Sequence, residues 1–213
     1  MSDLLMWLPG ILMSYAAFLL GIASPGPNVL AIIGTSMSVG RRSGISLAIG
    51  VAAGSFCWAV LSVAGLTALF AAYAPLLTAI KIFGGFYLLW LAYKAFKSAT
   101  LAHDLEAKTL SGGSRSAAGY ALRGFTIQMS NPNAVLAWVA VVSLGLHGDA
   151  PLWVGIVIVV GMSLLSVGLH ILYAVAFSTT TMIGIYSRAR RSIQATLGTF
   201  FGVAGLKLLL DET

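Results

Sequence analysis

Charged residues are scarce in this chain of 213 residues, since Asp, Glu, Lys and Arg together make up only 8% of it. Soluble domains carry roughly 25% charged residues. Here 59% of the residues are hydrophobic, and the mean hydropathy is +0.95. These values exclude an ordinary soluble domain and predict an integral membrane protein with no room for a separate soluble domain.

Cysteine is almost missing as well. Cys57 stands alone inside an apolar run, which excludes a disulfide framework, a Cys metal pair and a thiol-redox electron carrier. The sequence also has no Gly-rich phosphate loop, no His-x-x-x-His pair and no nucleophile elbow. We therefore expect no enzyme activity, no cofactor and no metal.

Acidic residues are missing from the apolar runs. All six lie at the termini or in predicted loops: Asp3, Asp104, Glu106, Asp149, Asp211 and Glu212. A carboxylate proton relay inside the membrane is therefore not expected. His170 is the only side chain within a predicted span whose charge changes near neutral pH, which makes it a hypothetical proton-coupling residue. The alternative is a neutral histidine hydrogen-bonded to a neighbouring helix.

Long apolar runs are abundant, and runs of about 18 residues or more are typical of membrane-spanning helices. They predict an all-α membrane protein with six transmembrane helices at 8–37, 44–72, 75–96, 119–146, 151–178 and 193–210. The first run is long enough to contain a kink or a partial re-entry at Pro25 and Pro27.

Basic residues orient these spans. They follow the first span, surround the link between the third and fourth, and precede the sixth: Arg41, Arg42, Lys94, Lys97, Lys108, Arg115, Arg123, Arg188, Arg190 and Arg191. By the positive-inside rule these loops are cytoplasmic and both termini face outward. This distribution beside apolar runs explains the net charge of +6 without a nucleic-acid partner.

Two proline motifs interrupt the first and fourth spans. They are Ser24-Pro25-Gly26-Pro27-Asn28 and Ser130-Asn131-Pro132-Asn133. Proline removes a backbone donor, and lipid cannot satisfy the freed backbone groups, so such a break must be buried in protein or line a wet cavity. Breaks at corresponding places in two halves indicate a transporter's binding site. We therefore expect Pro25, Gly26, Pro27, Asn28, Asn131, Pro132 and Asn133 to bind substrate, and a zwitterion suits helix ends and amides best. The alternative is that the prolines are packing kinks which the asparagines repair.

Similar residues recur in the two halves of the chain at nearly constant spacing. Pro27 precedes Pro132 by 105 residues, Gly54 precedes Gly161 by 107, and Lys94 precedes Lys207 by 113. Near-constant spacing predicts a 3+3 inverted repeat with Pro-broken first and fourth helices. The expected organisation is a first three-helix repeat at 1–96, a cytoplasmic linker at 97–118 and a second repeat at 119–213, within a single membrane domain.

The motifs resemble a known family. Besides the two proline motifs, the chain contains Gly84-Gly85-Phe86-Tyr87-Leu88 and Gly205-Leu206-Lys207. Together they resemble the lysine exporter (LysE) superfamily, in its threonine/homoserine efflux branch of amino-acid exporters, over essentially the whole chain. The resemblance implies a bacterial inner-membrane exporter of amino acids or derivatives such as homoserine lactone, working by proton exchange.

The resemblance has one departure. Family members often carry Asp at the position of Asn28 and Lys at that of Asn133, and here both are Asn. Losing both charges leaves the net charge of the site unchanged, but it removes a group that could carry a proton or bind a cation. A passive channel or facilitator for small zwitterionic metabolites is therefore the alternative function, while the expected partners are the substrate and the lipid bilayer. So small a transporter is also compatible with a homodimer.

Overall fold

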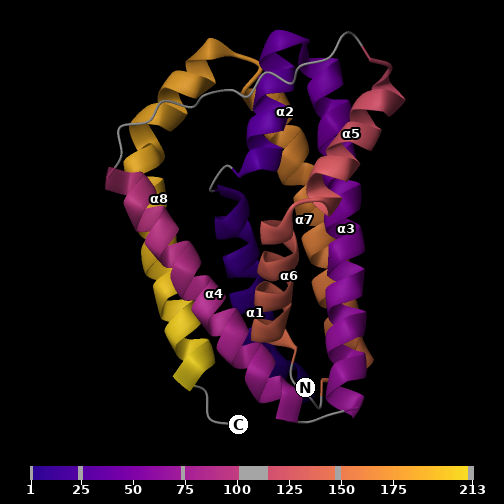
Figure 1. Cartoon of the computed structure of the whole chain (residues 1–213), viewed down its shortest axis with the longest axis vertical. Helices are drawn as coiled ribbons and strands as arrows, with labels where there is room; N and C mark the ends of the chain where they lie inside the picture. The colour runs from indigo at the N-terminus through magenta and orange to yellow at the C-terminus, as the bar shows by residue number, and fades with distance from the viewer. Residues whose placement is uncertain (1, 24–25, 73–74, 101–114, 147–149, 211–213) are drawn as a thin grey trace.

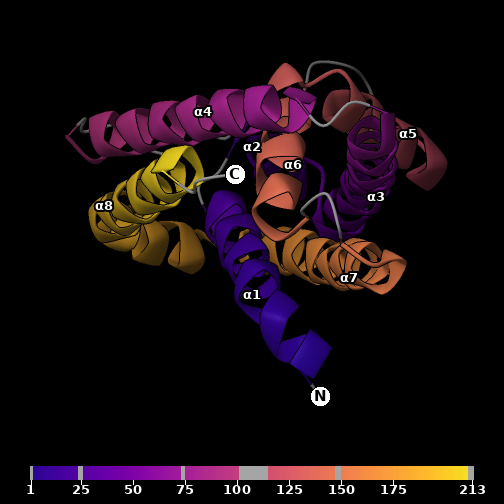
Figure 2. The ribbon, with the colours of Figure 1, turned by 90° about the horizontal axis from the view of Figure 1, so that it is seen from below.

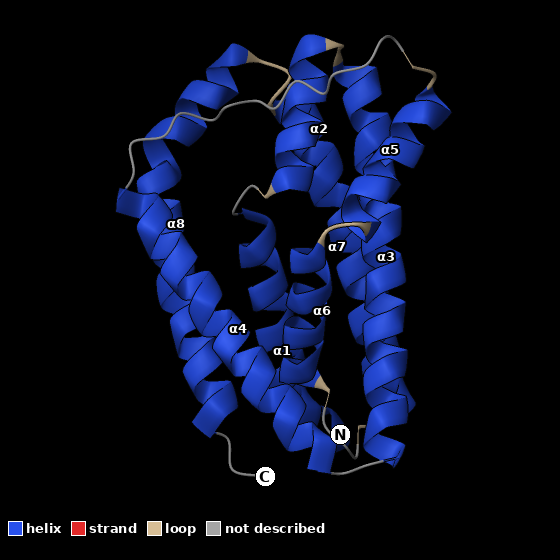
Figure 3. Cartoon of the chain, in the orientation of Figure 1, coloured by secondary structure: helices blue, strands red, loops and turns tan. Residues whose placement is uncertain are grey.

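The structure is a computed structural model that describes residues 2–23, 26–72, 75–100, 115–146 and 150–210. All regular secondary structure in these segments is α-helical (Figure 3). The helices are α1 (Ser2–Ala23), α2 (Pro27–Ser38), α3 (Arg41–Ala72), α4 (Pro75–Thr100), α5 (Ala117–Met129), α6 (Pro132–Gly145), α7 (Leu152–Ala176) and α8 (Thr180–Leu210).

Four helices contain segments long and apolar enough to cross a membrane. These segments are Leu5–Ile22, Arg41–Ala68, Leu152–Ala176 and Arg188–Leu210. A fifth span arises if α5 and α6, which are bent by 66° at their junction, count as one. The predicted span at 75–96 falls on α4, whose side chains are described only from Ile82 onward, and it is not among these segments. The described residues therefore show an α-helical membrane protein with four or five candidate spans.

Helix boundaries coincide with both proline motifs. Helix α2 begins at Pro27 and α6 begins at Pro132, each with the proline in the first turn. Proline suits this position because the first helical N–H has no partner within the helix anyway. The Asn131 side chain accepts a hydrogen bond from the Asn133 N–H at 3.1 Å and so caps α6. The predicted first span at 8–37 is thus covered by two helices, the first of which already starts at Ser2.

The start of the last helix differs from the prediction. The sequence predicts a loop ahead of a span at 193–210, but α8 begins at Thr180, so Arg188, Arg190 and Arg191 are helical. Arginine is a good helix former, and no proline lies between Thr180 and Leu210 to end the helix. Hydropathy marks only the part of a helix that suits lipid, and residues 187–192 of α8 are polar or basic except for one alanine, which is why the predicted span starts after them.

The helices form a bundle. Helices α4 and α8 lie side by side and cross on one side, α3, α5 and α7 stand on the other side, and α1, α2 and α6 lie between (Figures 1 and 2). Two helix pairs, α4 with α8 and α3 with α5, approach each other closely at glycines. A Cβ on Gly205 would lie 2.9 Å from the Gly85 carbonyl oxygen, and one on Gly124 would overlap the Leu47 carbonyl. Small residues permit such approaches between membrane helices.

The two ends of the bundle differ in charge. Helices α3, α5 and α8 begin at the end where α2, α4 and α7 finish (Figure 1). We call this the basic end, because Arg41, Lys97, Arg115 and Arg188 belong to the helix termini and turns gathered there. Helix α1 begins and α8 finishes at the opposite end.

Candidate functional site

The proline motifs meet at one cavity. Its volume is about 420 Å³, and its lining includes residues at the facing ends of α1, α2, α5 and α6. These helix ends come together near mid-height of α3 (Figure 1). Every described helix contributes to its lining. The wall includes the aromatic pair Phe18 and Trp138, whose ring centroids are 5.1 Å apart. A concave site with apolar walls and a few polar groups is the usual form of a small-molecule site.

Most of the residues singled out in the sequence line this cavity. They are Gly26, Pro27, Asn28, Asn131, Asn133 and His170. Pro132 is exposed and does not belong to the lining, since it occupies the first turn of α6. Pro25 lies outside the described residues. The structure thus brings both motifs and the histidine to a single place, although the two motifs are more than 100 residues apart in sequence.

Asn28 belongs to a hydrogen-bonded relay. Its Nδ2 donates to Gln128 Oε1 at 2.9 Å, and Gln128 Nε2 donates to Ser55 Oγ at 2.9 Å. The Trp58 indole N–H donates to the Gln128 backbone carbonyl at 3.3 Å, which serves one of the open carbonyls at the end of α5. The relay joins α2, α5 and α3, while Asn28 Oδ1 receives no hydrogen bond from another described residue.

Gln128 was not predicted from the sequence. Its side chain is only 3% exposed and lines the cavity. The sequence does contain a signal for it: Gln128 is an uncharged amide in an apolar run, two residues before Ser130. A polar residue in a span usually faces the bundle interior, so this rule would have pointed to it.

The second motif is used differently. The side-chain oxygen of Asn131 caps α6. The Asn133 backbone carbonyl accepts a hydrogen bond from Tyr87 Oη at 2.9 Å. The side-chain amide of Asn133 makes no hydrogen bond to any described residue. It therefore offers two donors and an acceptor at the cavity.

His170 presents one ring nitrogen that is not used. Nδ1 lies 2.7 Å from the Ser166 carbonyl oxygen, which can only accept, so Nδ1 carries the hydrogen. In the neutral ring Nε2 is then an acceptor, and it has no hydrogen-bond partner among the described residues. The side chain is 1% exposed and contributes to the cavity wall.

Comparison with known proteins identifies the family. The family described as LysE type translocator matches residues 19–212. The chain belongs to the LysE type translocator family. An uncharacterized membrane protein of Escherichia coli (strain K12) is 28% identical to this translocator over 96% of the chain and 91% of the relative. No solved structure matches the chain.

Two further relatives carry functional names. The threonine efflux protein of Salmonella typhi is 27% identical, over 91% of this LysE-type chain and 94% of the relative. The leucine efflux protein of Klebsiella pneumoniae subsp. pneumoniae is 27% identical over 60% of the chain and 61% of the relative.

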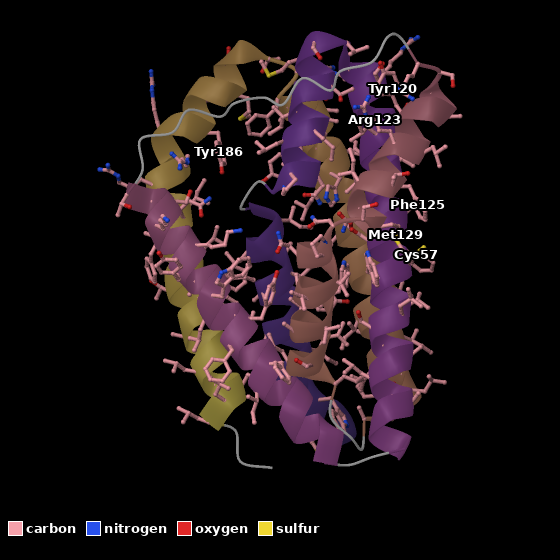
Figure 4. The ribbon with its side chains drawn as sticks, in the orientation of Figure 1. Cys57, Tyr120, Arg123, Phe125, Met129 and Tyr186 are labelled. Atoms are coloured by element: carbon pink, nitrogen blue, oxygen red, sulfur yellow. The ribbon has the colours of Figure 1, made fainter. Side chains whose placement is uncertain are left out.

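The cavity of this LysE-type protein has a basic side chain in its lining but no described acidic one. Lys94 of α4 belongs to the lining, whereas no carboxylate occurs among the side chains that the structure describes. Among the described residues, no three His, Cys, Asp or Glu side chains come together as a metal site would require. The single Cys57 is not part of the lining and lies on α3, at a height similar to that of Met129 at the end of α5 in the view of Figure 4.

Proposed function

We propose that this protein is a secondary transporter that exports amino acids or their derivatives across the bacterial inner membrane, with the cavity as its substrate site. The observation that carries the proposal is the meeting of both broken-helix motifs at one cavity of about 420 Å³. The relatives named for threonine and leucine efflux support the same class of substrate.

The proposed architecture is a 3+3 inverted repeat of six spans. Each half would consist of a broken helix and two long helices, namely α1 to α4 and α5 to α8. Support comes from the helix boundaries at Pro27 and Pro132 and from the close crossing of α4 and α8 at Gly85 and Gly205. With the basic end in the cytoplasm, both termini would face outward.

Substrate recognition is proposed to use the groups that the structure leaves open. The Asn133 amide and Asn28 Oδ1 face the cavity without a described partner. The first turn of α2 or α6 adds N–H groups that no helix can satisfy internally. An ammonium group suits the oxygen acceptors, and a carboxylate suits the N–H donors.

Proton exchange is proposed to pass through His170. Its Nε2 is the open base position in the ring, because Nδ1–H is held by the Ser166 carbonyl. Exchange would couple entry of a proton at this nitrogen to release of the substrate.

The test is efflux from cells preloaded with labelled amino acids, comparing wild type with Asn28→Ala and Asn133→Ala. Thr126→Ala is the matched control, because the Thr126 hydroxyl is exposed and bonds only the Leu122 carbonyl of its own helix. We expect the two asparagine variants to insert normally and lose most of the efflux, while Thr126→Ala keeps it. Normal efflux in both asparagine variants would make these residues structural repairs. Flux that never runs against a gradient would favour a passive facilitator.

A further inference from the structure

One face of α4 runs along the cavity toward the basic end. Tyr87, Leu91, Lys94, Ala95 and Ser98 all line the cavity, at the spacing of three or four residues that keeps side chains on one helical face. With a rise of 1.5 Å per residue, Lys94 begins about 10 Å beyond Tyr87 along the helix axis. Lys94 is thus placed between the broken helices and the basic end.

The Lys94 ammonium group has an aromatic neighbour but no counter-ion among the described side chains. Nζ lies 4.4 Å from the centroid of the Trp90 ring, one turn earlier on α4. Such a cation–π contact holds the ammonium over the ring and leaves its N–H donors free for an anion. Trp90 itself does not line the cavity, so its role would be to position the Lys94 ammonium group and not to contact a ligand.

Helix α8 adds polar groups at the same level. Arg190 donates to the carbonyl oxygen of Ser98 at 2.8 Å and to its hydroxyl at 3.0 Å. Gln194, one turn further along α8, is 4% exposed and lines the cavity. A second cation is thereby held beside the cavity lining at Ser98. The described lining offers no carboxylate to receive a positively charged side chain.

We propose that Lys94, acting with the N–H donors of the broken helices, binds the substrate's carboxylate and sets the charge selectivity of the transporter. The substrates would be amino acids or derivatives with a free carboxylate and a neutral or acidic side chain, and cationic amino acids would be selected against. This inference rests on the proposed function, because it names the substrate class of the same cavity. Lys94 is an exposed residue, so its ammonium group attracts an anion and repels a second cation at an effective dielectric constant between those of the protein interior and water.

The competing role for Lys94 is that of a snorkelling residue, with an apolar stem in the bundle and an ammonium group in the headgroup region. Lys97 provides the matched control, since both lysines are exposed on α4 but Lys97, in the last turn, does not line the cavity. Snorkelling predicts similar effects of changing either lysine. Carboxylate binding predicts an effect of Lys94 alone that depends on the charge of the substrate.

The experiment measures transport of labelled L-threonine, L-leucine, L-glutamate and L-lysine by purified protein in liposomes. The variants are Lys94→Gln, Lys94→Glu, Lys97→Gln and Lys97→Glu. We expect Lys94→Gln to lower threonine and glutamate transport about tenfold at sub-saturating concentration, which corresponds to about 1.4 kcal/mol. Lys94→Glu should in addition raise the lysine-to-threonine ratio, and both Lys97 variants should match wild type. Equal effects at both lysines, or a ratio unchanged by Lys94→Glu, would overturn the proposal.

A second measurement keeps this inference separate from the proposed function. Sodium L-glutamate should raise the thermal unfolding temperature of the detergent-solubilised wild type relative to sodium chloride at equal ionic strength. The shift should disappear in Lys94→Gln and persist in Lys97→Gln. If no amino acid is transported but this shift is found, the proposed function fails and the carboxylate site stands. If wild type shows no shift, the carboxylate site is refuted even where transport occurs.

Trp90 supplies a test of the positioning. Trp90→Phe keeps an aromatic face under the ammonium group, whereas Trp90→Leu removes it with an apolar side chain somewhat smaller than phenylalanine. We expect the lysine-to-threonine transport ratio to rise in Trp90→Leu and to stay near the wild-type ratio in Trp90→Phe. A general packing defect would instead reduce transport of all substrates in parallel, and that result would remove Trp90 from the proposal.

Discussion

Replacing Gln128 with leucine tests whether the relay between α2, α5 and α3 orders the substrate site. The change removes two hydrogen bonds of 2.9 Å each, one from Asn28 Nδ2 and one to Ser55 Oγ, while keeping a side chain of similar volume. Hydrogen bonds between membrane helices are worth about 0.6 kcal/mol on average and at most about 1.7. Asn28 and Ser55 line the cavity and can be solvated there, so the lower part of this range applies. We expect a loss of about 1–2 kcal/mol in the free energy of unfolding.

The assay is unfolding of the purified protein in detergent, arranged as a double-mutant cycle with Asn28→Ala. Because Asn28 and Gln128 share a hydrogen bond, the double variant should lose less stability than the two single variants predict, by about 0.6 kcal/mol. Thr126→Val is the control, since its exposed hydroxyl bonds only within its own helix. Additive effects, or a Gln128→Leu variant as stable as wild type, would show that the relay does not hold these helices together.

Three further predictions follow from individual contacts. Gly124→Ala should destabilise the protein by about 1–3 kcal/mol in thermal unfolding, because its Cβ would overlap the Leu47 carbonyl, whereas Gly168→Ala meets open space and should not. Asn131→Ala should cost about 1 kcal/mol of stability through loss of the α6 cap, with Asn131→Asp close to wild type; equal losses would refute the capping role. His170→Gln should abolish the dependence of transport on external pH, measured in liposomes, if the histidine carries the exchanged proton. An unchanged pH profile would assign His170 a structural role.

The location of the helix boundaries near the prolines could be predicted because proline has a local backbone effect. Pro27 and Pro132 stand in the first turns of α2 and α6, as a residue without an N–H should. The start of α8 at Thr180 could not be predicted from hydropathy, because residues 187–192 are largely polar and basic yet still helical. A hydropathy window measures how well a segment suits lipid. It does not measure whether the backbone of that segment is helical.

The partners within the site could not be predicted, because they depend on how distant helices face one another. Gln128 and Gln194 are each nearly buried at the cavity, yet neither spacing nor motif connects them with Asn28 or His170. Lys94 was interpreted as an orientation residue from its place near a span end. Its part in the cavity follows from the rotation of α4, which packing against α8 determines.

Three asparagines that look equivalent in the sequence have different roles open to them in the structure. The side-chain oxygen of Asn131 is bound to the backbone of α6, so this residue repairs the break that Pro132 introduces. Asn28 uses one donor on Gln128 and keeps its oxygen as an acceptor, while the whole amide of Asn133 remains open. The binding and repair interpretations of the motifs are therefore not exclusive, because each applies to different atoms. A ligand in this cavity would meet an acceptor from the first motif and a full amide from the second. Substitutions at Asn28 and Asn133 should thus affect substrate selectivity, whereas those at Asn131 should affect stability.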